Sequence, residues 1–197
     1  MPAVEVDKNR QLEVASFSIK YNDVFSLDDL YEGLKEWLEE YEWKGYDSDL
    51  KDDDADKAET HYSEVVGSAG RELSIRWRLK KERSFFFRWY FDITQETLAM
   101  KKTETVVGGK KITLDKGSYE IKVKAILEFD KEKGFSKGTY KPFRLFFLKF
   151  YKDRIEEEER ELYREAYIFQ SFIKKWLDLK GVIPFEGGKT VAYNIRM

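Results

Sequence analysis

Apolar and polar residues alternate along much of the chain up to residue 129, and this two-residue period is typical of β-strands that bury one face. In 85–98 the alternation places Phe85, Phe87 and the apolar residues that follow on the inward face. Gly108-Gly109 predicts a two-residue hairpin turn, and Asp115–Gly117 predicts a further turn. The pattern predicts strands over residues 11–21, 71–80, 85–98, 100–107, 110–114 and 118–129, and residues 60–66 could add one more.

Two segments show the spacing of amphipathic helices instead. Residues 27–42 place apolar side chains at every third or fourth position, and Ser26 before them is a good N-cap. Residues 142–180 contain no glycine and no internal proline, so a continuous helix there would be about 57 Å long. The charged segment 154–161 separates two apolar stretches, so either one helix crosses a solvent gap or two helices meet there.

The order of these elements predicts an α+β fold. We expect an antiparallel sheet of about five to six strands, one N-terminal amphipathic helix and a long C-terminal helix packed on the sheet. Residues 1–180 form a single domain in this interpretation, and the helix over 142–180 protrudes if it stays continuous. Residues 181–197 form a C-terminal tail with a short alternating pattern near its end.

Composition excludes several chemistries in this chain of 197 residues. There is no cysteine and one histidine, His61, which excludes disulfides, thiol nucleophiles and multi-histidine metal sites. Aromatic residues make up 16% of the chain, too many for an intrinsically disordered protein. Many Lys and Glu with few Asn and Gln is a bias typical of heat-adapted proteins.

Charge is unevenly distributed along the chain. Residues 28–64 carry 15 acids and 4 bases, a net charge of −11, while the whole chain carries −2. Such segregation allows complementary contacts between copies of the chain or with a partner. The first residues lack a signal-peptide pattern and no stretch reaches 18 apolar residues, so we expect a cytoplasmic protein or part of a particle assembled inside the cell.

The motifs that suggest chemistry are weak. Asp52, Asp54 and Asp56 have the spacing of a calcium loop, but Lys57 stands at the glycine position, so a solvated acidic loop over 47–56 is favoured over weak cation binding. Nothing fixes a catalytic partner for His61, and no pair of acids stands out for acid–base work. We therefore expect no enzyme, and no catalytic, cofactor or metal residues.

One predicted sheet face is basic and partly aromatic. Arg76, Arg78, Arg88 and Tyr90 share it, a combination that can bind single-stranded nucleic acid. The net negative charge favours the simpler interpretation, the solvated face of a half-buried sheet, and an acidic protein surface is a further option. Nucleic acid is therefore an unfavoured partner.

The order of strand, helix, antiparallel strands and long C-terminal helix resembles the helix-grip fold of START and Bet v1-like domains. That resemblance rests on element order over residues 11–180, and it implies an apolar cavity between the sheet and the last helix. A module that binds a hydrophobic small molecule is therefore the alternative function. Its cavity would be lined by aromatic residues of sheet and helix: Trp77, Phe87, Trp89, Phe91, Phe146, Phe147 and Phe150.

The favoured function is a non-catalytic structural, assembly or protein-interaction protein, with itself or another protein as partner. The long helix and the segregated charge both suggest self-association into a homo-oligomer. The tail could add a strand to the open sheet edge of a neighbour. The residues expected at the interaction surface lie on the distal helix and in the tail: Tyr163, Tyr167, Trp176, Val191, Tyr193 and Ile195.

Overall fold

The computed structural model describes residues 10–46, 58–68, 70–107, 110–130 and 151–180. It confirms an α+β fold built on one antiparallel sheet. The sheet has seven strands in the order β1-β7-β6-β5-β3, with β2 paired to β7 and β4 paired to β5. The elements are β1 (Gln11–Tyr21), β2 (Val24–Phe25), α1 (Leu27–Glu40), β3 (Lys44–Gly45), β4 (Glu59–Gly67), β5 (Gly70–Glu82), β6 (Phe87–Val107), β7 (Lys110–Phe129) and α3 (Lys152–Lys180).

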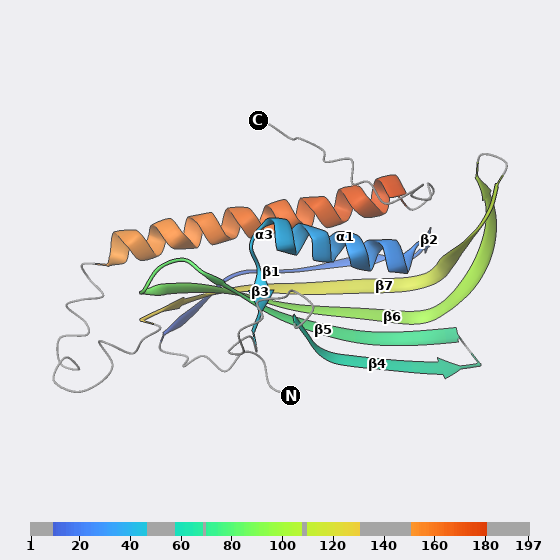
Figure 1. The fold of residues 1–197 in the computed structure, drawn as a ribbon, viewed down its shortest axis with the longest axis horizontal. Coiled ribbons are helices and arrows are strands. Elements are labelled where there is room, and N and C mark those ends of the chain that lie inside the picture. The colour runs from blue at the N-terminus through green and yellow to red at the C-terminus, as the bar shows by residue number, and fades with distance from the viewer. Residues whose placement is uncertain (1–9, 47–57, 69, 108–109, 131–150, 181–197) are drawn as a thin grey trace.

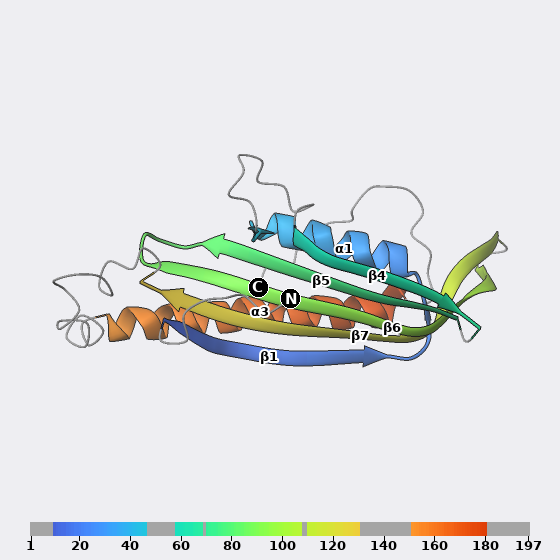
Figure 2. The same cartoon turned by 90° about the horizontal axis from the view of Figure 1, so that it is seen from below.

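Both helices cover the same face of the sheet (Figure 1). Seen from below, α1 lies toward the β4 side of the sheet, α3 lies along β7 and β1, and β1 forms one edge (Figure 2). The helix-covered face carries the alternating apolar residues of β1, β5, β6 and β7, and these pack with both helices into one buried cluster. This antiparallel sheet with a C-terminal helix is compatible with a helix-grip type of fold.

Helix α1 is short, and its position is fixed at its start and along its length. The Ser26 hydroxyl accepts a hydrogen bond from the Asp29 amide at 3.3 Å, the N-cap predicted from the sequence. The Asp115 carboxylate also accepts from the Leu27 amide at 3.4 Å, so β7 holds the same end. Farther along, a Cβ on Gly33 would lie 3.1 Å from the Trp176 indole nitrogen, so this glycine allows α1 and α3 to approach closely.

The sheet is larger than the sequence predicted, and one predicted turn is wrong. Strand β7 runs unbroken through Asp115–Gly117, and the neighbouring strand β6 has a bulge between Leu98 and Lys101, opposite the expected turn. Gly117 makes room for that bulge, because a Cβ there would lie 2.9 Å from the Met100 Cα. Beyond the bulge the β6–β7 ribbon bends away from the sheet (Figure 1).

Two aromatic positions at the start of β6 differ from the prediction. Phe85 precedes the strand and is exposed, whereas the alternation placed it inward. Phe86 is buried instead, and its ring stacks on Tyr151 with centroids 4.6 Å apart. The two-residue period fails here because Ser84 folds the chain back, its hydroxyl accepting from the amides of Phe86 and Phe87.

The C-terminal helix is one helix of 29 residues that begins near the charged segment. At 1.5 Å per residue it spans about 43 Å, and residues 142–150 lie outside the described part of the chain. The helix lies along the sheet and buries its apolar stripe from Leu162 to Leu177. Of the two alternatives for 154–161, the described residues show a single helix through this segment, and Arg83, which follows β5, pairs with Glu158 and Glu161.

Candidate interaction surface

Strand β1 is the edge of the sheet and pairs with β7 on one side only. The Phe129 amide donates to the Arg10 carbonyl at 2.9 Å, which shows that odd-numbered β7 residues direct their backbone groups toward β1. The register then pairs Phe17 with Val123 and Ile19 with Ile121 in this way. The backbone N–H and C=O groups of Ser16, Ser18 and Lys20 therefore point to the open side, where the described residues supply no strand.

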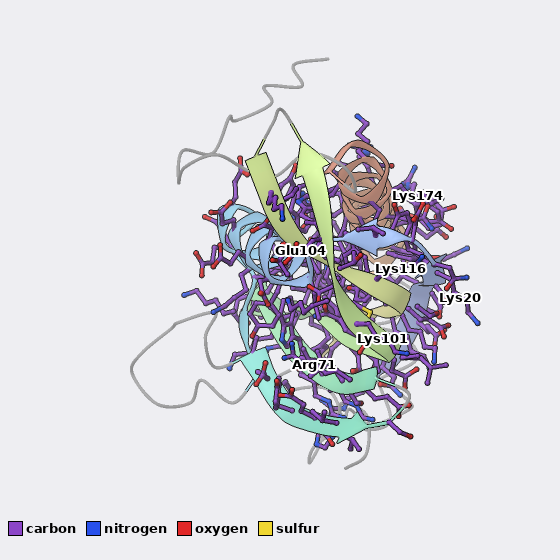
Figure 3. All side chains as sticks on the ribbon, turned by 90° about the vertical axis from the view of Figure 1, so that its right-hand side faces the viewer. Lys20, Arg71, Lys101, Glu104, Lys116 and Lys174 are labelled. Carbon is purple, nitrogen blue, oxygen red and sulfur yellow. The ribbon has the colours of Figure 1, made fainter. Side chains whose placement is uncertain are left out.

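Within the described part of the chain, little protects this edge against pairing with another chain. From Ala15 to Tyr21 it contains no proline or glycine and one charged residue, Lys20, which lies at the margin of the molecule in Figure 3 and whose side chain is 67% exposed. Its single irregularity, the bulge between Glu13 and Ala15, lies before this stretch. Natural edge strands usually carry several such protections, so a regular and nearly neutral edge is a candidate for strand pairing.

Two tyrosines of α3 are exposed in the layer that covers β1. Tyr163 and Tyr167 are 49% and 38% exposed, and their ring centroids are 4.5 Å apart. The Tyr167 ring also lies 6.2 Å from the ring of Phe17 on β1. The hydrogen bond that the Tyr163 hydroxyl donates to Tyr167 raises the pKa of Tyr163. We call Ser16, Phe17, Ser18 and Lys20 together with Tyr163 and Tyr167 the β1–α3 surface.

The other residues expected at this surface have different outcomes. Trp176 is 5% exposed and packs against α1 at Gly33, so the expectation that it is exposed is wrong. The helical period could not separate it from Tyr163 and Tyr167, because the position of α1 relative to α3 decides which side is covered. Val191, Tyr193 and Ile195 lie outside the described residues.

The arginine-rich face of the sheet is internally neutralised. Arg78 lies 3.9 Å from Asp92, and Arg88 pairs with Glu82 at 2.5 Å and with Glu128 at 3.7 Å. Tyr90 is buried and donates to Glu128 at 2.7 Å, and burial raises the pKa of this tyrosine. These groups already have partners, which leaves them poorly suited to bind phosphates or stack on bases.

The residues proposed to line a ligand cavity form packed core instead. Trp77, Phe87, Trp89 and Phe91 are all buried on the helix-covered face, and Trp43 stacks on Phe91 with centroids 3.9 Å apart. A hollow beside Tyr31 and Trp77 has a volume of about 10 Å³, room for one water molecule. Phe146, Phe147 and Phe150 lie outside the described residues.

A cluster of charged and aromatic side chains, which the sequence did not indicate, fixes α3 on the side opposite to β1. Lys81 pairs with Glu165 at 2.9 Å, and both side chains are largely buried. The Trp43 indole N–H also donates to Glu165 at 2.7 Å. The Lys81 ammonium lies 5.7 Å and 5.5 Å from the ring centroids of Trp43 and Trp89, within the range of cation–π attraction. The groups of the cluster bind one another, and in this way they hold the helix against the sheet.

His61 and the acidic side chains are the groups that the sequence offers for catalytic or metal chemistry. His61 is exposed on β4, opposite Arg76 in the register. No three acidic or histidine side chains within the described ranges come together as metal ligands would, and the acidic loop 47–56 lies outside them. Neither described helix has an apolar stretch of the length needed to cross a membrane. The sequence matches no family model and no curated protein.

Proposed function

We propose that this chain is a non-catalytic protein-interaction protein that self-associates through the β1–α3 surface. The observation that carries the proposal is the placement of the adjacent Tyr163 and Tyr167 rings beside β1, the strand at the open edge of the sheet. Exposed aromatic side chains supply contact area, and an unpaired strand edge supplies backbone hydrogen bonds. This surface offers both side by side.

The alternative, a START or Bet v1-like module for a hydrophobic molecule, has less support. Drug-sized ligands occupy sites of about 300–1,000 Å³, and the hollow between α1 and the sheet has about 10 Å³. The described aromatic residues of the core contact one another at stacking distances instead of facing a space. The contacts between α1, α3 and the sheet therefore favour the interaction function.

Size-exclusion chromatography with light scattering tests the proposal. We expect the wild-type chain to form a dimer or larger oligomer at micromolar concentration. The double variant Tyr163→Ser, Tyr167→Ser should weaken that association at least ten-fold, since each ring contributes exposed apolar area. Tyr62→Ser on β4 is a matched control, because Tyr62 is also 49% exposed but lies away from the surface. A wild-type chain that stays monomeric at high concentration would contradict the proposal.

A further inference from the structure

We infer that β1 pairs antiparallel with β1 of a second copy of this chain across a two-fold axis, so that two sheets become one. This inference rests on the proposed self-association and names its partner and geometry. A two-fold contact uses the same patch on both copies, so the patch must be complementary to itself. The β1 edge meets that requirement in its backbone, its side-chain faces and its charges.

The backbone of the edge is suited to antiparallel pairing. Ser16, Ser18 and Lys20 direct their N–H and C=O groups outward, as derived above from the β1–β7 register. With Ser18 on the two-fold axis, Ser18 faces its own counterpart, and Ser16 faces Lys20 of the second copy. Each of these three residues then exchanges hydrogen bonds with an outward-directed residue, so the backbone groups at the open side gain partners.

The faces of the two sheets also match. A two-fold axis perpendicular to the sheet keeps the helix-covered faces of both copies on the same side. Phe17 and Ile19, which face the helices, then lie opposite each other across the new junction. Above them the two α3 helices bring their Tyr167 rings, already in contact with Phe17, toward the axis. The exposed apolar area of the β1–α3 surface is covered from both sides.

The charges on the edge favour the antiparallel direction. Glu13 is exposed near the start of β1, and Lys20 is exposed near its end. Antiparallel pairing moves Glu13 of one copy toward Lys20 of the other at both ends of the junction. Parallel pairing in register would instead place like charges together, which is unfavourable. The charges of the β1 edge are therefore complementary to those of a second copy in antiparallel pairing only.

Cysteine crosslinking tests the geometry, because the chain has no cysteine of its own. Directly opposite residues in an antiparallel pair have Cα atoms about 5.5 Å apart, within the range that a disulfide bridges. Ser18→Cys should therefore form a covalent dimer under mild oxidation. If the register is shifted by one pair, Ser16 of one copy faces Ser18 of the other, and a mixture of Ser16→Cys and Ser18→Cys chains should form the covalent dimer instead. Ser63→Cys on the opposite edge strand β4 is the matched control and should stay monomeric on a non-reducing gel.

A proline variant tests the same junction without crosslinking. The Ser18 N–H points away from β7, so Ser18→Pro removes a bond of the proposed junction and none of the β1–β7 ladder. We expect at least a ten-fold rise in the dimer dissociation constant with a melting temperature near that of the wild-type protomer. If the wild type self-associates but the edge cysteines do not crosslink faster than Ser63→Cys, the β1 junction is wrong and the proposed function stands. A monomeric wild type overturns both.

Discussion

The two edges of the sheet differ in how their backbone is protected. At one edge β1 offers a regular stretch from Ala15 to Tyr21 with one charge. At the other, the outer side of β5 is shared by the two-residue strand β3 and by β4, which is irregular between Glu59 and His61. Strand β4 also carries charged residues, of which Glu64 pairs with Arg71 at 2.6 Å. Strand β1 also has one bulge and two charged residues, but the bulge and Glu13 lie before its regular stretch, whereas β4 is shorter and shares its side of the sheet with β3.

Helix α3 repeats this contrast across its width. The side toward β5 is fixed by the Lys81–Glu165 pair and the Trp43 indole, whereas the side toward β1 exposes two tyrosines. The contacts that attach α3 to the sheet and the surface that α3 exposes therefore lie on different sides of the helix. Because of this separation, some substitutions can change the interaction surface and keep the fold of the protomer. Others can change the stability of the protomer and leave the surface unchanged.

The largest expected effect comes from releasing the attached side of α3. Glu165→Gln leaves the Lys81 ammonium largely buried without its carboxylate, and loss of one partner of a buried pair costs about 3 kcal/mol. For a chain of this size that lowers the melting temperature by about 10 °C, measured by differential scanning calorimetry. Lys174→Gln on the exposed side of α3 is the control. An unchanged melting temperature for Glu165→Gln would show that the cluster does not anchor the helix.

A smaller effect is expected from removing the protection of the β4 edge. The double variant His61→Val, Glu64→Val replaces polar residues with strand-favouring apolar ones and removes the Glu64–Arg71 pair, which is partly exposed and adds little stability. We expect species larger than the wild-type oligomer in dynamic light scattering at the same concentration. If the variant keeps the wild-type size, charge on the edge is not what distinguishes β4 from β1.

The sequence predicts the fold class well because period and capping are local signals. The alternation in 118–129 and the Ser26 cap are both found in the structure. The turn at Asp115–Gly117 was wrong because glycine there serves a close approach between strands, which depends on Met100, a residue distant in sequence. The strands β2 and β3 are too short to show a period at all.

The candidate surface could be predicted only in part. The sequence predicts Tyr163 and Tyr167 as exposed residues of the interaction surface. Their position beside β1 depends on the strand order, which no local pattern encodes. The same limit explains Trp176, which is buried by α1, and Glu165, whose partners Lys81 and Trp43 come from two other elements. Contacts between elements that are distant in the chain were therefore the part that the sequence did not provide.

The smallest expected effect distinguishes the direction of pairing at β1. Glu13→Lys should weaken self-association by about two- to five-fold, because it places bases at both ends of the junction, and exposed pairs contribute less than about 1 kcal/mol. Lys20→Glu should do the same, although it also removes the exposed contact with Glu120 at 3.5 Å. The double variant Glu13→Lys, Lys20→Glu reverses both charges and should restore wild-type affinity in sedimentation equilibrium at low salt. Two single variants without effect, or a double variant weaker than either, would mean that Glu13 and Lys20 do not meet across the axis.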